Sequence, residues 1–155
     1  MNQGHLSPVV SDIFHNKILL VTLAVWAIAQ TLKVLLGILR ERRFNFKWFI
    51  GTGGMPSSHA AGATALATAC GLEYGFSSVY FALAAVFALV TMFDAASVRR
   101  SVGKQAIIMN KLIDEFYVEG KFSEQRVREF LGHTPVEVLI GAALGIGVSI
   151  LYCIW

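Results

Sequence analysis

Residues 17–39 read KILLVTLAVWAIAQTLKVLLGIL, an apolar run long enough to cross a bilayer as one helix. A helical crossing needs about 20 mostly apolar residues. Three further runs, at residues 57–72, 76–98 and 135–155, qualify or nearly qualify. The sequence therefore predicts an all-α integral membrane bundle of about four transmembrane helices.

The overall composition supports a membrane protein. Hydrophobic residues make up 55% of the chain and charged residues only 15%, whereas soluble domains carry about 25% charged residues. The net charge of +3 is too small to indicate a nucleic-acid partner. Two cysteines are too few for a disulfide framework. We expect one domain over residues 1–155, with a polar leader at 1–16 and no cleavable signal peptide.

Small residues indicate how the helices pack. The run at 57–72 is short and rich in alanine, glycine and threonine, as expected of a helix inside a bundle, where small residues let backbones approach. Gly141 and Gly145 give the last helix a face suited to the same close packing.

The loops predict the orientation. The loop after the first helix and the long loop at 99–134 hold most of the basic residues, and alternation places these loops on one side of the membrane. The positive-inside rule makes that side cytoplasmic, with both chain ends on the far side. Within the long loop, residues 104–117 and 123–132 have the pattern of amphipathic helices lying at the membrane interface.

Two histidines stand where chemistry is expected. His59 lies in GTGGMPSSHAAGATALA, residues 51–67, and His133 lies just before Pro135. Each begins a membrane helix, on the same side of the membrane by the predicted topology. Helix N-termini offer free N–H groups and the positive end of the helix dipole, so they attract anions. The pair suggests a pocket built around a phosphate.

Cations with the same placement support this interpretation. Lys33 lies inside the first span, where an ammonium group is costly and usually faces a partner or a polar cavity. Arg40 follows two turns later on the same face. Arg99 and Arg100 begin the long loop soon after Asp94, which could hold an arginine through a charge-assisted hydrogen bond.

Each of these features also has a purely structural interpretation. Thr134 and Glu137 form the pattern of a capping box. Ser57 and Ser58 could be ordinary polar residues at a helix start, and Lys33 could extend its ammonium group to the membrane surface. No metal site is predicted, because the cysteines fall near the opposite membrane face from the histidines, and no cofactor is expected.

Three motifs together resemble a known family. GGMPSSHAA, DAASVRRSVGKQA and LGHTPVEVLIGAALG, in this order, are similar to the divergent branch of the type 2 phosphatidic acid phosphatase family, which is related to acid phosphatases and vanadium-dependent haloperoxidases. Lys33 and Arg40 match that family's first motif, with Glu41 in place of its proline. Val127 stands where the third motif has an arginine, and Arg126 and Arg128 flank that position. Arg99 or Arg100 is also a candidate for that role.

The resemblance implies a metal-independent phosphatase with a phosphohistidine intermediate. His133 would be the nucleophile, Glu137 would orient its ring, and His59 would be the general acid and then the base. The phosphate oxygens would be held by Lys33, Arg40, Ser57, Ser58, Arg99 and Arg100, with Asp94 as an orienting carboxylate. A pocket at the membrane surface favours a lipid phosphate monoester or diphosphate as substrate.

Two other functions stay open at this point. A phosphate-lipid binder or transporter would keep the pocket without turnover, and the changed motif residues favour it. A structural membrane subunit would tolerate replacement of His59 and His133, but it leaves Lys33 unexplained. The sequence decides neither the substrate, among phosphatidate, phosphatidylglycerol phosphate and isoprenyl phosphates, nor whether the chain forms a homo-oligomer.

Overall fold

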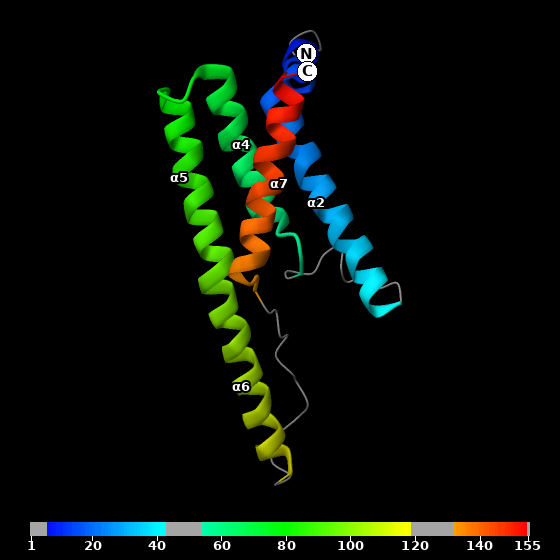
Figure 1. Cartoon of the computed structure of the whole chain (residues 1–155). Coiled ribbons are helices and arrows are strands. Elements are labelled where there is room, and N and C mark those ends of the chain that lie inside the picture. Colours follow the sequence, from blue (N-terminus) through cyan, green and yellow to red (C-terminus); the bar gives the residue numbers. More distant parts are fainter. Residues whose placement is uncertain (1–5, 43–53, 119–131, 155) are drawn as a thin grey trace.

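The computed structural model describes residues 6–42, 54–118 and 132–154, and the described residues fold into helices. The elements in chain order are α1 (Leu6–His15), α2 (Lys17–Glu41), α4 (Ser58–Tyr74), α5 (Val79–Phe93), the π-helical turn η1 (Asp94–Val98), α6 (Arg99–Val118) and α7 (Pro135–Ile154). The predicted all-α bundle is confirmed (Figure 1).

Helix α4 is the centre of the bundle and packs against α2, α5 and α7. Most of its residues are buried, and nearly all of those are alanine, glycine, serine or threonine. Such side chains let neighbouring backbones approach closely, which drives helix association where lipid removes the hydrophobic contribution. The prediction that the second apolar run packs inside the bundle is therefore confirmed.

The contact between α4 and α7 is the closest in the bundle. A Cβ atom on Gly141 would overlap the Ser57 backbone, and one on Gly145 would overlap Thr64 and the Ala61 carbonyl. Thr64 also donates a hydrogen bond from Oγ1 to the Ala142 carbonyl oxygen, at 3.2 Å. The predicted small-residue face of the last helix is thus the face that contacts α4.

Three helical segments within the described residues are long and apolar enough to cross a membrane: Lys17–Arg40, Val79–Asp114 and Pro135–Ile154. Helix α4 has 17 residues, about 25 Å at 1.5 Å per residue, which is shorter than a bilayer's hydrocarbon core of about 30 Å. The second predicted crossing, residues 57–72, is therefore a short helix that packs against the other three.

The third predicted span differs most from the structure. Helix α5, η1 and α6 follow one another without a break from Val79 to Val118, so the predicted interfacial helix at 104–117 is the far end of a longer rod (Figure 1). The charges after Asp94 indicate the end of the apolar segment, but a helix can continue into water because its hydrogen bonds are internal. The second amphipathic helix, predicted at 123–132, falls almost wholly outside the described residues.

Residues 6–15 of the predicted polar leader form the helix α1. Asn16 then caps α2 by accepting a hydrogen bond from the Leu19 backbone N–H at 3.0 Å. Both ends of the chain lie at one end of the bundle, together with the turn between α4 and α5 (Figure 1). The starts of α4 and α7 lie at the opposite end, as the predicted alternation requires.

Candidate functional site

The site lies where the starts of α4 and α7 meet the middle of α2. The Ser57 backbone N–H donates to the Glu137 carbonyl oxygen at 3.1 Å, which holds the first turn of α4 against the first turn of α7. As a result His59 and His133, far apart in the sequence, have ring centroids only 6.0 Å apart, with an angle of 63° between the rings. The prediction that both histidines lie at one end of the bundle is confirmed.

His133 is completely buried, with 0% of its surface exposed. Its Nδ1 lies 3.3 Å from Glu137 Oε2, and its backbone N–H donates to the Ala95 carbonyl oxygen at 3.1 Å. Its Nε2 makes no hydrogen bond of acceptable geometry with any part of the chain that the structure describes. A buried polar atom without a partner costs about 1–3 kcal/mol, so Nε2 is marked as a site for a ligand or for chemistry.

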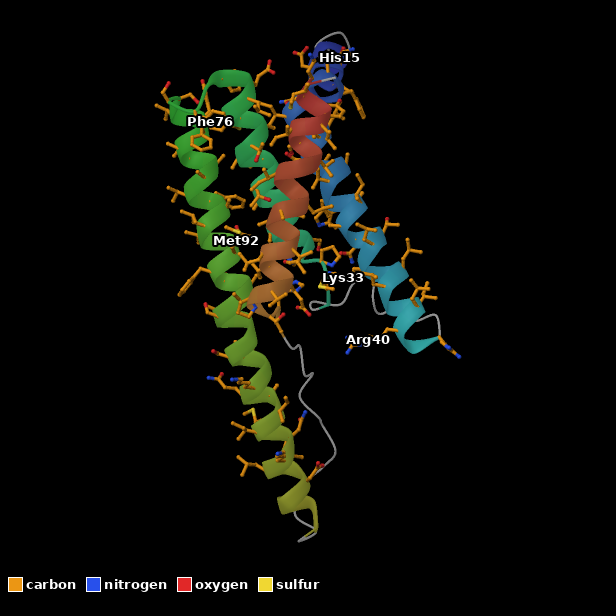
Figure 2. The ribbon with its side chains drawn as sticks, in the orientation of Figure 1. His15, Lys33, Arg40, Phe76 and Met92 are labelled. Atoms are coloured by element: carbon orange, nitrogen blue, oxygen red, sulfur yellow. The ribbon has the colours of Figure 1, made fainter. Side chains whose placement is uncertain are left out.

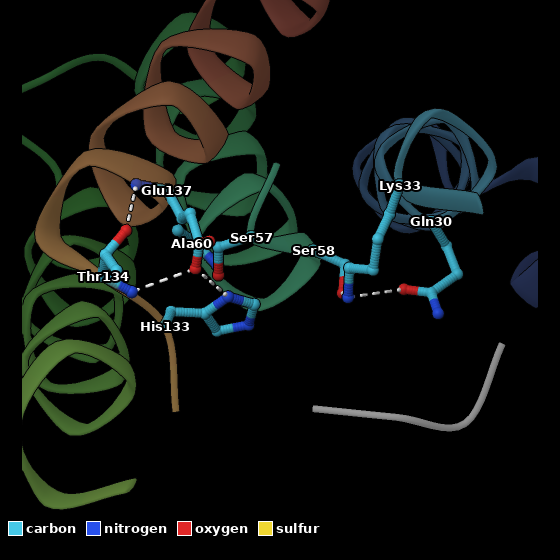
Figure 3. A network of polar contacts seen from close by, with 8 residues as sticks. All are labelled: Gln30, Lys33, Ser57, Ser58, Ala60, His133, Thr134 and Glu137. Atoms are coloured by element: carbon cyan, nitrogen blue, oxygen red, sulfur yellow. Dashed lines mark hydrogen bonds and ion pairs between the residues drawn. The ribbon is translucent and has the colours of Figure 1, made fainter. Parts of the chain in front are cut away.

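Glu137 combines two roles that the sequence offered as alternatives. Its Oε2 accepts a hydrogen bond from the Thr134 backbone N–H at 3.0 Å, and its own N–H donates to Thr134 Oγ1 at 3.3 Å, which completes the capping box. The same Oε2 is the partner of His133 Nδ1 (Figure 3). Because Thr134 fixes the carboxylate, the carboxylate in turn fixes the imidazole plane and leaves Nε2 directed away from it.

The electrostatic surroundings keep His133 neutral. Burial lowers the pKa of His133 below its usual value, and the positive charge of Lys33 lowers it further. The hydrogen bond and negative charge of Glu137 raise the pKa in opposition, and so, more weakly, does a ring contact with the Gly54 backbone that falls short of hydrogen-bond geometry. The net shift is downward, which favours a free electron pair on one ring nitrogen at neutral pH.

Lys33 reaches the site from α2 and is buried, with 6% of its surface exposed. Its Nζ lies 3.2 Å from Gln30 Oε1 and 3.5 Å from Ser58 Oγ (Figure 3). The ammonium group therefore points into the bundle, which excludes the alternative that it extends to the membrane surface. Gln30 was not among the predicted site residues. A polar side chain three residues before Lys33, on the same face of an apolar helix, does indicate a partner for the lysine.

The two serines of the motif differ in what they do. Ser57 is the N-cap of α4, and its Oγ accepts a hydrogen bond from the Ala60 N–H at 3.3 Å. Ser58, in the first helical turn, is the serine whose hydroxyl contacts Lys33. Gly54 precedes them with φ +85°, a conformation that favours glycine, and lies against the Lys33 side chain.

The remaining predicted residues lie at the edges of this cluster. Arg40 is exposed in the last turn of α2, on the side of the helix that faces the rest of the bundle (Figure 2). Asp94 is half-buried at the start of η1. The side chains of Arg99 and Arg100 lie outside the described part of the structure, and so do Arg126, Val127 and Arg128.

The π-helical turn connects the rod to the site. A π-turn widens the helix and displaces its hydrogen-bonding pattern, and such turns are common at functional sites. Here the turn includes Ala95, the residue whose carbonyl oxygen accepts from the His133 backbone N–H. Ala95 also packs with Ala60 and Val138 in an apolar cluster beside the two histidines. Nothing in the sequence around Asp94 indicated this turn.

Comparison with known proteins agrees with the motifs. The sequence matches the profile of the divergent PAP2 family over residues 14–148. This chain belongs to the divergent PAP2 family. The chain is also 40% identical, over 146 residues, to the "uncharacterized membrane protein YuiD" of Bacillus subtilis (strain 168), covering 87% of this chain and 92% of that protein. No solved structure matches this chain.

Membership of the divergent PAP2 family confirms the resemblance seen in the three motifs, and it makes the protein a phosphatase-related membrane protein. The matched region, residues 14–148, runs from before the start of α2 into α7 and includes every group described above. The relative from Bacillus subtilis is likewise a membrane protein. The cytoplasmic orientation of the site stays a prediction.

Proposed function

We propose that this divergent PAP2 protein is an integral-membrane phosphatase that hydrolyses a lipid phosphate monoester or diphosphate. The observation that carries the proposal is His133, a buried imidazole oriented through Nδ1 by a carboxylate, with an unpartnered Nε2 and a second imidazole 6.0 Å away. A nucleophile oriented by one group and served by a neighbouring acid or base is the general pattern of covalent catalysis.

In the first step, His133 Nε2 attacks phosphorus, and a P–N bond forms as the ester P–O bond breaks. His59 donates its proton to the leaving alkoxide oxygen. In the second step, the now neutral His59 takes a proton from water, and the water oxygen attacks phosphorus while the P–N bond breaks. Inorganic phosphate leaves, and both histidines return to their starting states.

Charge on the phosphoryl oxygens is stabilised by Lys33, which enters the site already desolvated and aimed by Gln30 and Ser58. Preorganised cations in a dry site stabilise a transition state more strongly than cations in water. Arg40 is suited to guide the anionic headgroup, because it is exposed on the same face of α2 two turns away. We further propose that Arg99 or Arg100 completes the oxyanion contacts.

A lipid substrate is favoured over a soluble one by the position of the site. The apolar cluster of Ala60, Ala95 and Val138 lies beside the histidines. Beyond Lys33, the last two turns of α2 expose Leu35, Leu36 and Leu39, which are 50%, 42% and 75% exposed. Large exposed apolar side chains on a membrane helix face acyl chains, so a phosphate reaching Lys33 passes apolar surface that suits a lipid tail.

A phosphate-lipid binder without turnover is the second candidate. The complete burial of His133 favours it, because phosphorus must come into line with Nε2 for attack. If the protein is a binder, replacing Lys33 should weaken its affinity for the lipid phosphate. Phosphate release should then stay at the background rate in the wild type and in the His133 variant alike.

The test is phosphate release from lipid phosphates in mixed micelles, with excess chelator present. We expect His133→Gln to abolish turnover, and His59→Gln to reduce it by about 10²–10⁴-fold, the usual contribution of a general acid. His15→Gln is the matched control, because His15 is exposed on α1 with its ring against its own helix. A base-stable, acid-labile phosphate on the wild-type protein would identify the phosphohistidine.

Release of phosphate at equal rates by wild type and His133→Gln would contradict the mechanism. Saturable lipid-phosphate binding without any release, weakened by Lys33→Met, would establish the binder instead.

A further inference from the structure

A cavity with both apolar and charged lining residues lies at the end of the bundle opposite the histidines. It has a volume of about 530 Å³ and opens between the start of α2 and the ends of α4 and α7. Its lining consists of Lys17, Ile18, Ala69, Glu73, Tyr152, Cys153 and Ile154. In Figure 1 this is the end at which the N- and C-terminal labels lie together. The proposed phosphatase chemistry uses none of these residues.

The cavity has one charge of each sign, from different helices. Lys17 is the first residue of α2, and Glu73 lies in the last turn of α4. Within the described structure neither side chain forms a hydrogen bond or an ion pair, with the other or with any third residue. The helix dipoles reinforce both charges, because a helix is positive at its start and negative at its end. The cavity therefore has charged side chains of opposite sign in its lining.

The level of the cavity restricts what fills it. Lys17 begins one candidate membrane span and Ile154 ends another, so the cavity lies where the hydrocarbon core meets the polar region of the bilayer. Lipid headgroups occupy that level. Ile18, Ala69 and Ile154 supply apolar lining, and Tyr152 supplies an aromatic ring of the kind that lies at this interface.

We propose that this cavity binds the headgroup of a zwitterionic phospholipid. The phosphate lies against Lys17 and the positive end of α2. The ammonium lies against Glu73 and the negative end of α4, with the Tyr152 ring available for a cation–π contact. A purely anionic headgroup meets repulsion from Glu73, and a cation alone meets repulsion from Lys17. The occupant suited to the cavity is therefore a molecule that has both charges.

Isolated charges at the ends of membrane helices are common, and they serve there as interface anchors. Such anchors point outward to the surrounding lipid or water. Lys17 and Glu73 are exposed, as anchors are, but they also line one cavity between three helices, with opposite charges. This arrangement leaves a site for a dipolar group between them, which anchoring does not require.

Cys153 provides the readout, because it lines the cavity and is exposed, whereas Cys70 is buried. The full chain in nonionic detergent is treated with a maleimide, with and without short-chain phosphatidylethanolamine. We expect bound lipid to slow modification of Cys153 by about tenfold at about ten times Kd, because the free fraction falls as 1/(1 + [L]/Kd). Phosphatidylglycerol at the same concentration should leave the rate unchanged, and so should free phosphoethanolamine.

Variants of Lys17 and Glu73 test whether these two charges are responsible for the protection of Cys153. Lys17→Gln and Glu73→Gln should each restore rapid modification in the presence of phosphatidylethanolamine. Lys111→Gln, an exposed lysine on α6, is the matched control and should keep full protection. His133→Gln should also keep it, so the result is independent of the phosphatase proposal.

Equal protection by phosphatidylglycerol would overturn the proposal in favour of general shielding by lipid. Absence of protection by phosphatidylethanolamine, or protection that persists in both charge variants, would overturn it as well. Protection by free phosphoethanolamine would identify a soluble zwitterion in place of the lipid.

Discussion

Helices α4 and α5 are neighbours of similar length, yet they meet opposite environments. Helix α4 is made of alanine, glycine, serine and threonine and is buried along most of its length. Helix α5 has the larger apolar residues, but only Ala84 and Ala88 are buried. Leu83, Val86 and Phe87 are 66%, 60% and 57% exposed. In lipid the large apolar side chains face outward, and the small ones form the interior.

The same difference in packing determines where the site lies. Close approach of α7 to α4 is what brings His133 beside His59 and places Glu137 over the Ser57 backbone. Helix α5 contacts α4 through small residues. The turn that follows α5 adds to the site one carbonyl oxygen, that of Ala95, which accepts from the His133 N–H. The tightest packing and the candidate chemistry therefore belong to the same pair of helices.

The largest expected effect comes from separating that pair. Gly145→Ala places a methyl group against the Ala61 carbonyl and Thr64, where backbone cannot move aside cheaply. Overpacking of this kind costs about 1–3 kcal/mol. Gly147→Ala is the matched control, because a Cβ there meets nothing within 4 Å, and it gains the same helix propensity. Thermal unfolding in detergent measures the difference, and equal stability of the two variants would contradict the close contact.

An effect of similar size is expected from exchanging the side-chain sizes of α4 and α5. Ala65→Leu on α4 inserts a large side chain at a position that is 0% exposed, and we expect a loss of about 1–3 kcal/mol. Leu83→Ala on α5 removes a large side chain from an exposed position and should change stability by less than about 0.5 kcal/mol. Unfolding of both variants in one detergent tests this. A large loss in Leu83→Ala would show that α5 has a protein partner on that face.

The smallest expected effect is a shift in the pH dependence of phosphate release. Protonated His133 cannot attack phosphorus, so the rate falls as the pH drops through its pKa, which burial holds below its usual value. Glu137→Gln removes a charge that raises this pKa, so the acid limb should move to lower pH. Lys33→Met removes a charge that lowers the pKa, so the limb should move to higher pH.

Residual activity suffices for the pH–rate profiles of the two variants, because only the position of the acid limb is compared. Asp12 is exposed on α1, so Asp12→Asn is the control and should leave the acid limb in place. A shift in the same direction for Glu137→Gln and Lys33→Met would contradict His133 as the group that titrates.

Much of the fold and some of the site could be predicted from the sequence. Apolar runs predicted the helices of the bundle, because hydropathy and length alone decide whether a segment can cross a bilayer. The cost of a charge in lipid predicted a polar environment for Lys33, and it is buried against Gln30 and Ser58. The charges after Asp94 were a poorer guide, because they mark a change of solvent and do not end a helix.

The choice between Ser57 and Ser58 could not be predicted. They are adjacent at a helix start, but Ser57 has extended backbone and caps α4, while Ser58 begins the helix and meets Lys33. One step in the backbone conformation decides which hydroxyl faces α2. The two interpretations of Glu137 were likewise offered as alternatives, although one carboxylate oxygen serves both the cap and His133.

By itself the sequence determined that this chain is a membrane bundle of helices and that both histidines begin helices at the same end of it. Those properties follow from local rules, namely hydropathy, helix length and the alternation of crossings. Only the tertiary structure decided that the rings lie 6.0 Å apart, that Nε2 of His133 is buried without a partner, and that Lys17 and Glu73 line one cavity. These depend on which helix faces meet, and the close fit of glycine against backbone between α4 and α7 fixes that choice.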